Sequence, residues 1–272
     1  MIVLVGMVIG LVLGLTGAGG SIFAMPLLTL LLGLSVHDAV GLALGAVAVS
    51  SLVGALRCWH GGGILWLPAT ILGAAGAVSA PIGNMLGSKT SPSILAAGFT
   101  VLAFVVAIRM WQQAKAAPEQ SHILRASPIA SHGFIAPTCR LSQTGQFELK
   151  PRCVSALLFG GVVVGLVGGF FGVGGGFLVV PLILYLSRVS MQQAVSTSLA
   201  IVAVVSAGGF STYLINVATV EWATLGWLVF GGVMGMMLGI SSAQKLAGPT
   251  LQQVFSLLLA LLAGLMLVKT LV

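Results

Sequence analysis

Two glycine clusters are the residues of this chain whose type and spacing could do chemistry. Successive backbone N–H groups in such a loop, followed by a helix N-terminus, present positive partial charge to an anion. A proline follows each cluster, and the pattern predicts an anion-binding site built largely from backbone. The predicted residues are Gly17, Gly19, Gly20, Ser21 and Pro26 in the first cluster and Gly172, Gly174, Gly175, Gly176 and Pro181 in the second.

The two clusters belong to a sequence repeat. Residues 10–54 and 165–209 align without a gap at an offset of 155, with 19 of 45 positions identical. The similarity continues at an offset of 156, which aligns Gly83 with Gly239. Paired Gly/Pro-interrupted segments in an apolar chain indicate a secondary transporter with its site at the interruptions. The alternative is that the glycines only let helices pack closely, which suits a single glycine better than two matched clusters.

Hydroxyl side chains could complete the anion site. A polar triplet opens a long apolar segment, and two further serines occupy equivalent positions in the repeats. These predicted substrate-binding residues are Ser196, Thr197, Ser198, Ser51 and Ser206. The alternative is that each hydroxyl bonds back to a carbonyl of its own helix. We expect Asn84 and Asn216 to cap segment ends, and we place His37 and His60 at segment ends too.

The remaining reactive side chains exclude several functions. The four acidic residues lie in a polar stretch or near segment ends, so the chain lacks the intramembrane carboxylate of a cation pump, a proton relay or an aspartyl protease. No Ser/His/Asp set shares a depth, so we expect no enzyme. The cysteines, Cys58, Cys139 and Cys153, form no CxxC pair, so we expect free thiols, no metal site and no cofactor.

The elements that must position these residues are membrane helices. The chain has 272 residues, of which 58% are hydrophobic and 6% charged, with a mean hydropathy of +1.16. Apolar runs near 20 residues recur without the alternation of a barrel, which predicts an all-α polytopic membrane protein. The expected apolar segments are 2–16, 21–33, 38–58, 64–86 and 92–112, then 154–171, 176–187, 190–214, 221–243 and 249–270.

The first two segments of each half are short for a membrane of about 30 Å. They are expected to be tilted helices or a re-entrant hairpin with the glycine loop at its tip. The predicted domains are a first membrane repeat at 1–112, a polar cytoplasmic linker at 113–152 and a second membrane repeat at 153–272. The fold class is therefore two inverted-topology repeats, with 8–10 transmembrane or re-entrant helices and Gly-rich broken helices at the midplane.

Charge predicts the orientation. The net charge is +7, but the chain has no basic stripe with interleaved aromatics, so we expect lipid headgroups and no nucleic acid as partners. Placing the linker in the cytoplasm leaves Lys89 and Lys269 outside and the other nine Lys and Arg residues inside, which satisfies the positive-inside rule. Both termini then lie outside.

At the glycine clusters the sequence resembles the TauE/SafE family, the sulfite exporter or four-toluene-sulfonate uptake permease group. The stretches GLTGAGGSIFAMPLL and GLVGGFFGVGGGFLVVPLIL look like its paired signature, and AVSTSLAIV is also similar. The resemblance covers roughly residues 5–112 and 153–270. It departs from the pattern at Gly41–Gly45, where GLALG replaces a TS-containing stretch, so the site is expected to be asymmetric. The linker is longer than is typical.

The resemblance implies a carrier of the bacterial or archaeal inner membrane, in a family whose members are linked to sulfite, sulfonates and other sulfur-containing anions. Together with the anion site, it predicts a secondary transporter that exports such an anion, with a proton as the candidate coupling ion if the anion is taken up instead. An anion channel and a non-transporting membrane subunit or assembly factor of a sulfur-metabolism system are the alternatives.

Overall fold

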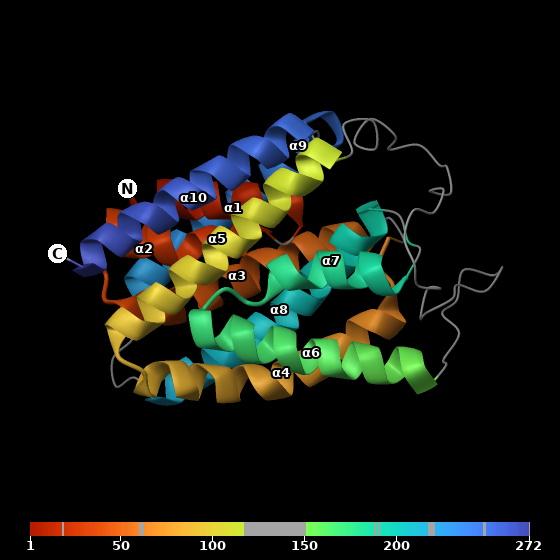
Figure 1. The fold of residues 1–272 in the computed structure, drawn as a ribbon, viewed down its shortest axis with the longest axis horizontal. Helices are drawn as coiled ribbons and strands as arrows, with labels where there is room; N and C mark the ends of the chain where they lie inside the picture. Colours follow the sequence, from red (N-terminus) through yellow and green to blue (C-terminus); the bar gives the residue numbers. More distant parts are fainter. Residues whose placement is uncertain are drawn as a thin grey trace.

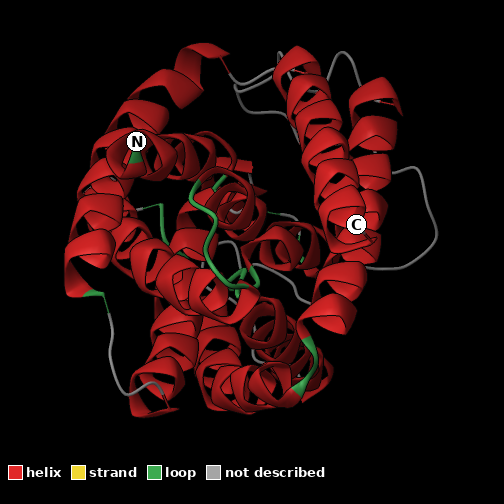
Figure 2. Ribbon diagram, turned by 90° about the vertical axis from the view of Figure 1, so that its left-hand side faces the viewer, coloured by secondary structure: helices red, strands yellow, loops and turns green. Residues whose placement is uncertain are grey.

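The computed structural model describes residues 1–17, 19–59, 63–116, 151–187, 189, 191–216, 221–246 and 249–271. The first half contains α1 (Ile2–Thr16), the 3-10 helix η1 (Gly19–Phe23), α2 (Ala24–Leu31), α3 (Val36–Trp59), α4 (Trp66–Lys89) and α5 (Pro92–Ala116) (Figure 1). The second half contains α6 (Pro151–Phe171), α7 (Gly176–Leu186), α8 (Met191–Asn216), α9 (Trp222–Leu246) and α10 (Pro249–Leu271). Figure 2 shows that helices and loops account for all of the described chain, which contains no strand.

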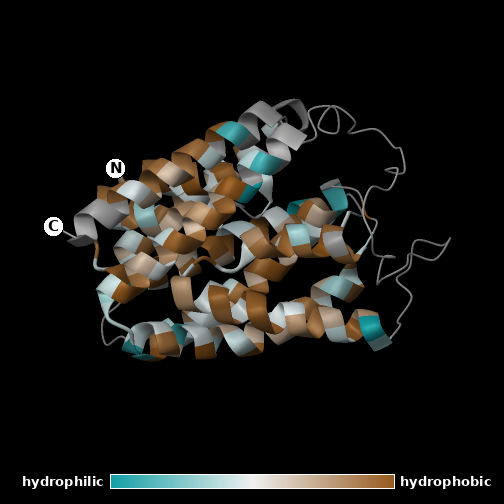
Figure 3. Ribbon diagram, in the orientation of Figure 1, coloured by the Kyte–Doolittle hydropathy of each residue, from teal (hydrophilic) through white to brown (hydrophobic). Residues whose placement is uncertain are grey.

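Length and composition make this an all-helical polytopic membrane protein. Six of the described helices are long and apolar enough to cross a membrane: Val36–Trp59, Trp66–Lys89, Pro92–Arg109, Pro151–Phe171, Gln192–Asn216 and Trp222–Ser242. Brown, hydrophobic residues run along the helices in Figure 3, and hydrophilic residues gather at the helix ends. The expected helical fold is therefore confirmed, with five α-helices on each side of the predicted linker. Residues 117–150, which hold most of that linker, lie outside the described chain.

Local sequence explains where several helices begin and end. Pro92, Pro151 and Pro249 each open a helix, at the position where the missing N–H has no intrahelical partner to lose. Ser35 precedes α3 and its hydroxyl accepts from Asp38 N at 3.2 Å while donating to the Asp38 carboxylate at 2.6 Å. The Ser35 hydroxyl thus caps the start of α3 by accepting from the backbone N–H of Asp38. Gly17 ends α1 in the left-handed conformation that lacks a steric cost only for glycine.

The bundle has two distinct ends. We call the end where α5 finishes and α6 starts the linker end, and the end where α1 starts and α10 finishes the terminal end (Figure 1). Helix α6 starts at the linker end and so does α8, so α7 must carry the chain back towards it. In the same way α2 returns the chain to the terminal end before α3 begins. The pairs α1 with α2 and α6 with α7 are thus hairpins whose two helices run in opposite directions. The expectation that both helices of each pair are short is wrong for α6, which has 21 residues and is long enough to cross a membrane.

Contacts between the two halves come in matched pairs. Helix α1 packs on α9 as α6 packs on α4, since these are the first and fourth helices of opposite halves. Helices α3 and α8 pack on each other, as do α5 and α10. The contact of α3 with α9 likewise matches that of α4 with α8. The halves therefore interlock, and two of the strongest helix pairs join first and fourth helices across them.

Glycine stripes make the α1–α9 and α4–α6 contacts possible. On α1 a Cβ atom at Gly14 would lie 2.7 Å from Met236 O of α9, and on α6 one at Gly161 would lie 2.7 Å from Leu72 O of α4. Close backbone approach through small residues drives association of membrane helices. For these stripes the packing explanation of the glycines is correct. The contacting glycines at equivalent positions are Gly6, Gly10 and Gly14 on α1 and Gly161, Gly165 and Gly169 on α6.

The cysteines depart from expectation at one position. Cys58 is a free thiol, as predicted. Cys153, buried near the start of α6, is disulfide-bonded, so the expectation of a free thiol there is wrong. Spacing along the chain could not reveal this, because a disulfide depends on which segments the fold brings together. Cys139 and His60 lie outside the described residues. The part of the chain that is described contains no group of His, Cys, Asp and Glu able to hold a metal ion.

Candidate functional site

The second glycine cluster forms the tight loop between α6 and α7. Gly172, Gly174 and Gly175 have φ values of 70°, 65° and 68°, which side chains with a Cβ rarely adopt. Val173 N and Gly174 N donate to Gly168 O at 2.9 and 3.3 Å, which closes the end of α6 and removes these two N–H groups from any ligand. Gly175 then precedes α7 without a side-chain cap. The first N–H groups of α7 are therefore the donors that this loop offers.

Ser206 of α8 lies beside this loop. Its side chain is fully buried, and its Oγ has no hydrogen-bond partner in the described chain. A Cβ atom at Gly174 would collide with this oxygen, so only glycine lets the hydroxyl approach so closely. A buried hydroxyl without a partner costs roughly 1–3 kcal/mol. Ser206 lies near the middle of α8, and such an unused donor beside an uncapped helix start is suited to an anion.

The first glycine cluster is built differently. Gly17 has a φ of 71°, its N–H donates to Leu13 O at 2.7 Å, and the chain continues from Gly19 to Ser21 in η1. Gly20 packs against the backbone of Leu13, and Ser21 is buried. Helix α2 follows without a side-chain cap. This cluster thus also leads into a helix start.

The serine equivalent to Ser206 is occupied. Ser51 Oγ donates to Val47 O at 2.5 Å, one turn back in its own helix. The alternative reading of a hydroxyl bonded to its own helix therefore applies at Ser51 and not at Ser206. The two prolines differ as well, since Pro26 is buried in α2 whereas Pro181 is exposed on α7. The structure does not bring Pro181 to the loop interior.

The polar triplet Ser196–Ser198 joins α8 to two segments of the first half at the linker end. Ser198 Oγ lies 2.8 Å from Gly17 O and 2.7 Å from Val195 O, and it can donate to either carbonyl. Leu65 N, at the start of α4, donates to Thr197 Oγ1 at 3.0 Å. Ser196 lies so close to Gly63 that a Cβ atom there would be 3.1 Å from Ser196 Oγ. Eight residues, or about 12 Å of helix, separate Ser198 from Ser206, so the triplet and the buried hydroxyl are not one cluster.

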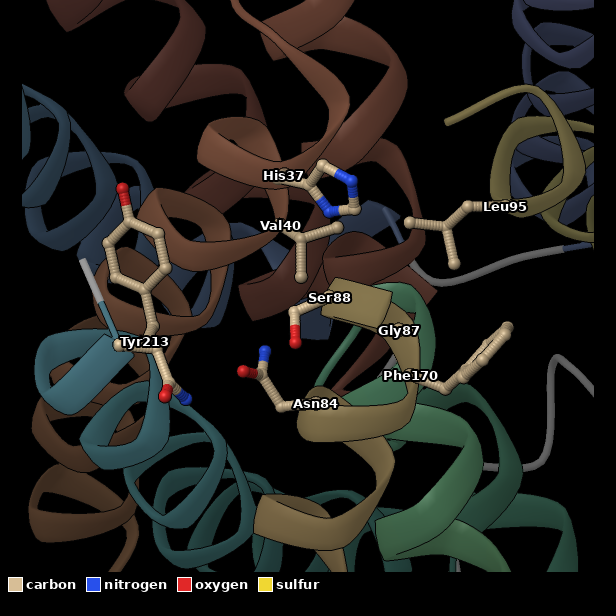
Figure 4. Close-up of a pocket in the computed structure, with 9 residues that line it drawn as sticks. His37, Val40, Asn84, Gly87, Ser88, Leu95, Phe170 and Tyr213 are labelled. Atoms are coloured by element: carbon tan, nitrogen blue, oxygen red, sulfur yellow. The ribbon is translucent and has the colours of Figure 1, made fainter. Parts of the chain in front are cut away.

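A cavity of about 60 Å³ lies at the terminal end, and sequence reasoning missed it. In Figure 4 Asn84 and Ser88 of α4 face His37 and Val40 of α3 across it, with Tyr213 to one side and Phe170 to the other. Asn84 was expected to cap a segment end, but it lies five residues inside α4 and is only 6% exposed. A polar amide at the position where the other repeat has Ile240 was the available signal.

The carboxylate of Asp38 lies beside the cavity but is turned to other partners. Asp38 accepts from Ser35 Oγ at 2.6 Å and from Tyr213 OH at 3.3 Å, and it does not line the cavity. Asn216 lines the cavity and donates one of its amide hydrogens to Thr212 O at 2.9 Å. It is thus a helix-end residue, as expected, but one that also faces the cavity.

Comparisons with known proteins agree with these features. The family model described as "Sulfite exporter TauE/SafE" matches residues 2–266. A probable membrane transporter protein of Xylella fastidiosa is 30% identical over 264 residues, covering 95% of this chain and 90% of that protein. The probable membrane transporter protein YdhB of Bacillus subtilis is 28% identical, covering 88% of each chain. One from Methanocaldococcus jannaschii is 24% identical, covering 79% of this chain and 72% of its own. No solved structure matches.

The resemblance seen in the glycine clusters is thereby confirmed, and the match runs through the linker as well as through both halves. The relatives are bacterial and archaeal. The described residues form ten α-helices, six of them long and apolar enough to cross a membrane, and this is the setting in which that match is found. The chain belongs to the TauE/SafE family of membrane transporters, which are not enzymes.

Proposed function

We propose that this protein is a secondary transporter of small sulfur-containing anions such as sulfite, sulfonates or thiosulfate. The observation that carries the proposal is the uncapped start of α7 beside the unpartnered, buried hydroxyl of Ser206. A helix N-terminus favours negative charge, and a hydroxyl without a partner is ready to donate. The substrate binds against Gly174, Gly175, Gly176 and Ser206, and the first glycine loop approaches it from the other half.

The two halves are proposed to be inverted-topology repeats, residues 1–112 and 153–272. The matched contacts of α1 with α9 and of α6 with α4 support this, because a two-fold relation exchanges them. Two glycine contacts support it further: Gly17 packs on Val195 and Gly172 packs on Val40, and both pairs are related by the offset of 155. Alternating access by rocking then exposes the loops first to one end and then to the other.

The sequence suggests that one intact repeat rocks against the other, but the helix contacts favour a different pair of moving bodies. Backbone contacts through Gly10 and Gly165 fasten α1 to α9 and α6 to α4. We expect interfaces of this closeness to move as one body, since mainly backbone and small side chains lie between the helices. We therefore propose that the moving bodies are mixed pairs, each with a helix from both halves.

The direction proposed is export from the cytoplasm, with the linker cytoplasmic and both termini outside. An inside-negative potential favours anion exit by about 2.3 kcal/mol per charge per 100 mV, so export needs no coupling ion. Of the described acidic residues, Asp38 lies in the first turn of α3 and Glu221 lies just before α9, so no described carboxylate lies near the middle of a helix, where it could carry a proton across the membrane.

Flux measurements in proteoliposomes test the proposal. Labelled sulfite, thiosulfate, sulfate and taurine are supplied with and without a membrane potential and a pH gradient. Saturable flux of one sulfur anion, driven by the potential alone, is the expected result. Rapid flux that does not saturate and shows no countertransport would identify a channel instead. No flux of any anion through folded, inserted protein would contradict transport and favour the role of a membrane subunit.

A further inference from the structure

We infer that the cavity at the terminal end is a second binding site, for a small oxyanion that enters or leaves through that end of the bundle. The inference deepens the proposed function and rests on it for the class of substrate. The cavity is distinct from the start of α7: its lining comes from α3, α4, α6 and α8 and from the beginning of α5. Its volume of about 60 Å³ exceeds the ~10–15 Å³ that a single water needs.

Asn84 is the residue that points to a ligand. Asn84 is only 6% exposed, and no residue of the described chain makes a hydrogen bond to its amide. In Figure 4 this amide extends into the space between α4 and α3. The amide faces the cavity and not packed protein, since Ser206 Oγ is the one fully buried side-chain nitrogen or oxygen without a partner among the described residues. A ligand in the cavity supplies the partner that the protein does not.

The other polar groups of the cavity favour an anion. The imidazole of His37 is also without a hydrogen bond to the described chain, and either of its tautomers carries one N–H donor. Asn216 has a second amide hydrogen beyond the one given to Thr212 O. No described carboxylate lines the space, since Asp38 is engaged by Ser35 and Tyr213. Three side chains with an N–H donor to give, and no described acid among them, suit a small oxyanion better than a cation.

The cavity adjoins the proposed transport site. Val40 lines the cavity, and its Cα lies 2.7 Å from the place of a Cβ atom at Gly172, the first glycine of the α6–α7 loop. Phe170, two residues before that glycine, also lines the cavity. An anion in the cavity is therefore separated from the α6–α7 loop, which contains Gly174, by Val40 and the end of α6.

The residue equivalent to Asn84 in the second half is apolar, so the two halves differ at this position. The offset of 156 that aligns α4 with α9 places Ile240 where the first half has Asn84. The glycine contacts support this register, since Gly83 packs on Leu166 as Gly239 packs on Leu11. An isoleucine offers no donor, so the equivalent position towards the linker end cannot bind an anion in this way. This difference supplies a matched control.

Thiol labelling tests the site without requiring transport. Ser88 lines the cavity and is exposed, so Ser88→Cys, in a chain whose three native cysteines are replaced by Ala, reports access to it. The labelling rate with a negatively charged methanethiosulfonate is measured in choline sulfate and in choline gluconate of equal ionic strength. We expect saturating sulfate to slow labelling about tenfold. Choline is too large to compete for the cavity, so protection reports the anion.

Two variants connect protection to Asn84. Asn84→Leu, of similar volume, should abolish protection by sulfate, and Asn84→Asp should abolish it and also slow the anionic reagent itself. The matched control Ile240→Leu should leave protection unchanged. Thermal unfolding of each variant shows that it is folded. Equal labelling rates in sulfate and gluconate, or full protection in folded Asn84→Leu, would overturn the inference.

Flux in the same variants separates this inference from the proposed function. Protection without flux retains the cavity site and contradicts transport. Flux without protection retains transport and removes the cavity site. When both hold, Asn84→Leu should raise the KM for the anion at the terminal end about tenfold, as expected for the loss of one hydrogen bond to a charged group.

Discussion

At the linker end, Thr197 and Ser198 of α8 bond to Leu65 N and Gly17 O, whereas at the terminal end their repeat equivalents, Leu42 and Ala43, carry no hydroxyl. The first arrangement fastens the loops of the first half to α8. At the terminal end a cavity lies beside α3, and the hydroxyl of Tyr213 on α8 donates a hydrogen bond to Asp38 on α3 at 3.3 Å. Equivalent helices are thus hydrogen-bonded to the first half at one end of the bundle and line a cavity at the other, and the four predictions below test this contrast.

The largest effect is expected from Gly174→Val. Its φ of 65° disfavours any branched side chain, and the new Cβ would collide with Ser206 Oγ. We expect a loss of flux of about 100-fold or more, because overpacking displaces the loop and the hydroxyl together. Gly226→Val is the control, since nothing lies within 4 Å of a Cβ atom there. Wild-type flux from well-expressed Gly174→Val protein would rule out the loop as the binding site.

The two repeat-equivalent serines should differ in transport. Ser206→Ala removes the unpartnered hydroxyl and should lower kcat/KM for the anion about tenfold while leaving the unfolding temperature unchanged or raised. Ser51→Ala removes a hydroxyl already bonded to Val47 O and should leave transport unchanged. The kinetics of labelled-anion flux and thermal unfolding in detergent measure both. Equal losses in the two variants would show that the hydroxyls act alike and that the asymmetry is wrong.

Breaking the tie at the linker end should open that end. Thr197→Val keeps the shape of the side chain but loses the acceptor for Leu65 N, at a cost of about 1 kcal/mol. We expect the free thiol of Cys58, near the end of α3, to react severalfold faster with a soluble maleimide. Thr70→Val is the control, because that exposed hydroxyl bonds only to Leu67 O of its own helix. An unchanged Cys58 rate would mean that the bond does not hold the end closed.

The smallest effect is expected from Tyr213→Phe. The ring still packs on Gly41 and stacks with Phe210, so only the 3.3 Å bond to Asp38 is lost. Because a cavity already lies at that end, transport should change less than about twofold. A change as large as that of Thr197→Val would show that both ends are tied equally.

Much of the fold was predictable, because it depends on local patterns. The ten apolar segments, the hairpin turns at glycines and the left-handed positions follow from hydropathy and from the conformational freedom of glycine. Ser206 could be singled out by its place in the repeat. The role of the triplet could not, since its partners lie 132 and 181 residues away in the chain. The cavity at Asn84 was also hidden, because residues from five helices line it and these must pack before it exists.

The redox state of Cys153 can test which side of the membrane the linker faces. The positive-inside rule puts the start of α6 in the cytoplasm, where thiols are kept reduced, whereas Cys153 in that region is disulfide-bonded. The redox state of Cys153 in intact cells therefore tests the orientation. Because the side chain is buried, free thiols are blocked with a membrane-permeant maleimide as the cells are denatured, and a blocked Cys153 would place the linker in the cytoplasm. An oxidised Cys153 in intact cells would instead place the linker outside.

The glycine stripes also bear on how the protein is made. Gly10 of α1 packs on Gly232 of α9, so α1 cannot pack on its partner helix until about 220 further residues have been synthesised. At ~5–20 residues per second this delay is roughly 10–45 s. Throughout that time α1 presents bare backbone to lipid or to the insertion machinery. The first half therefore cannot complete its helix packing when it leaves the ribosome, because the partner of α1 belongs to the second half.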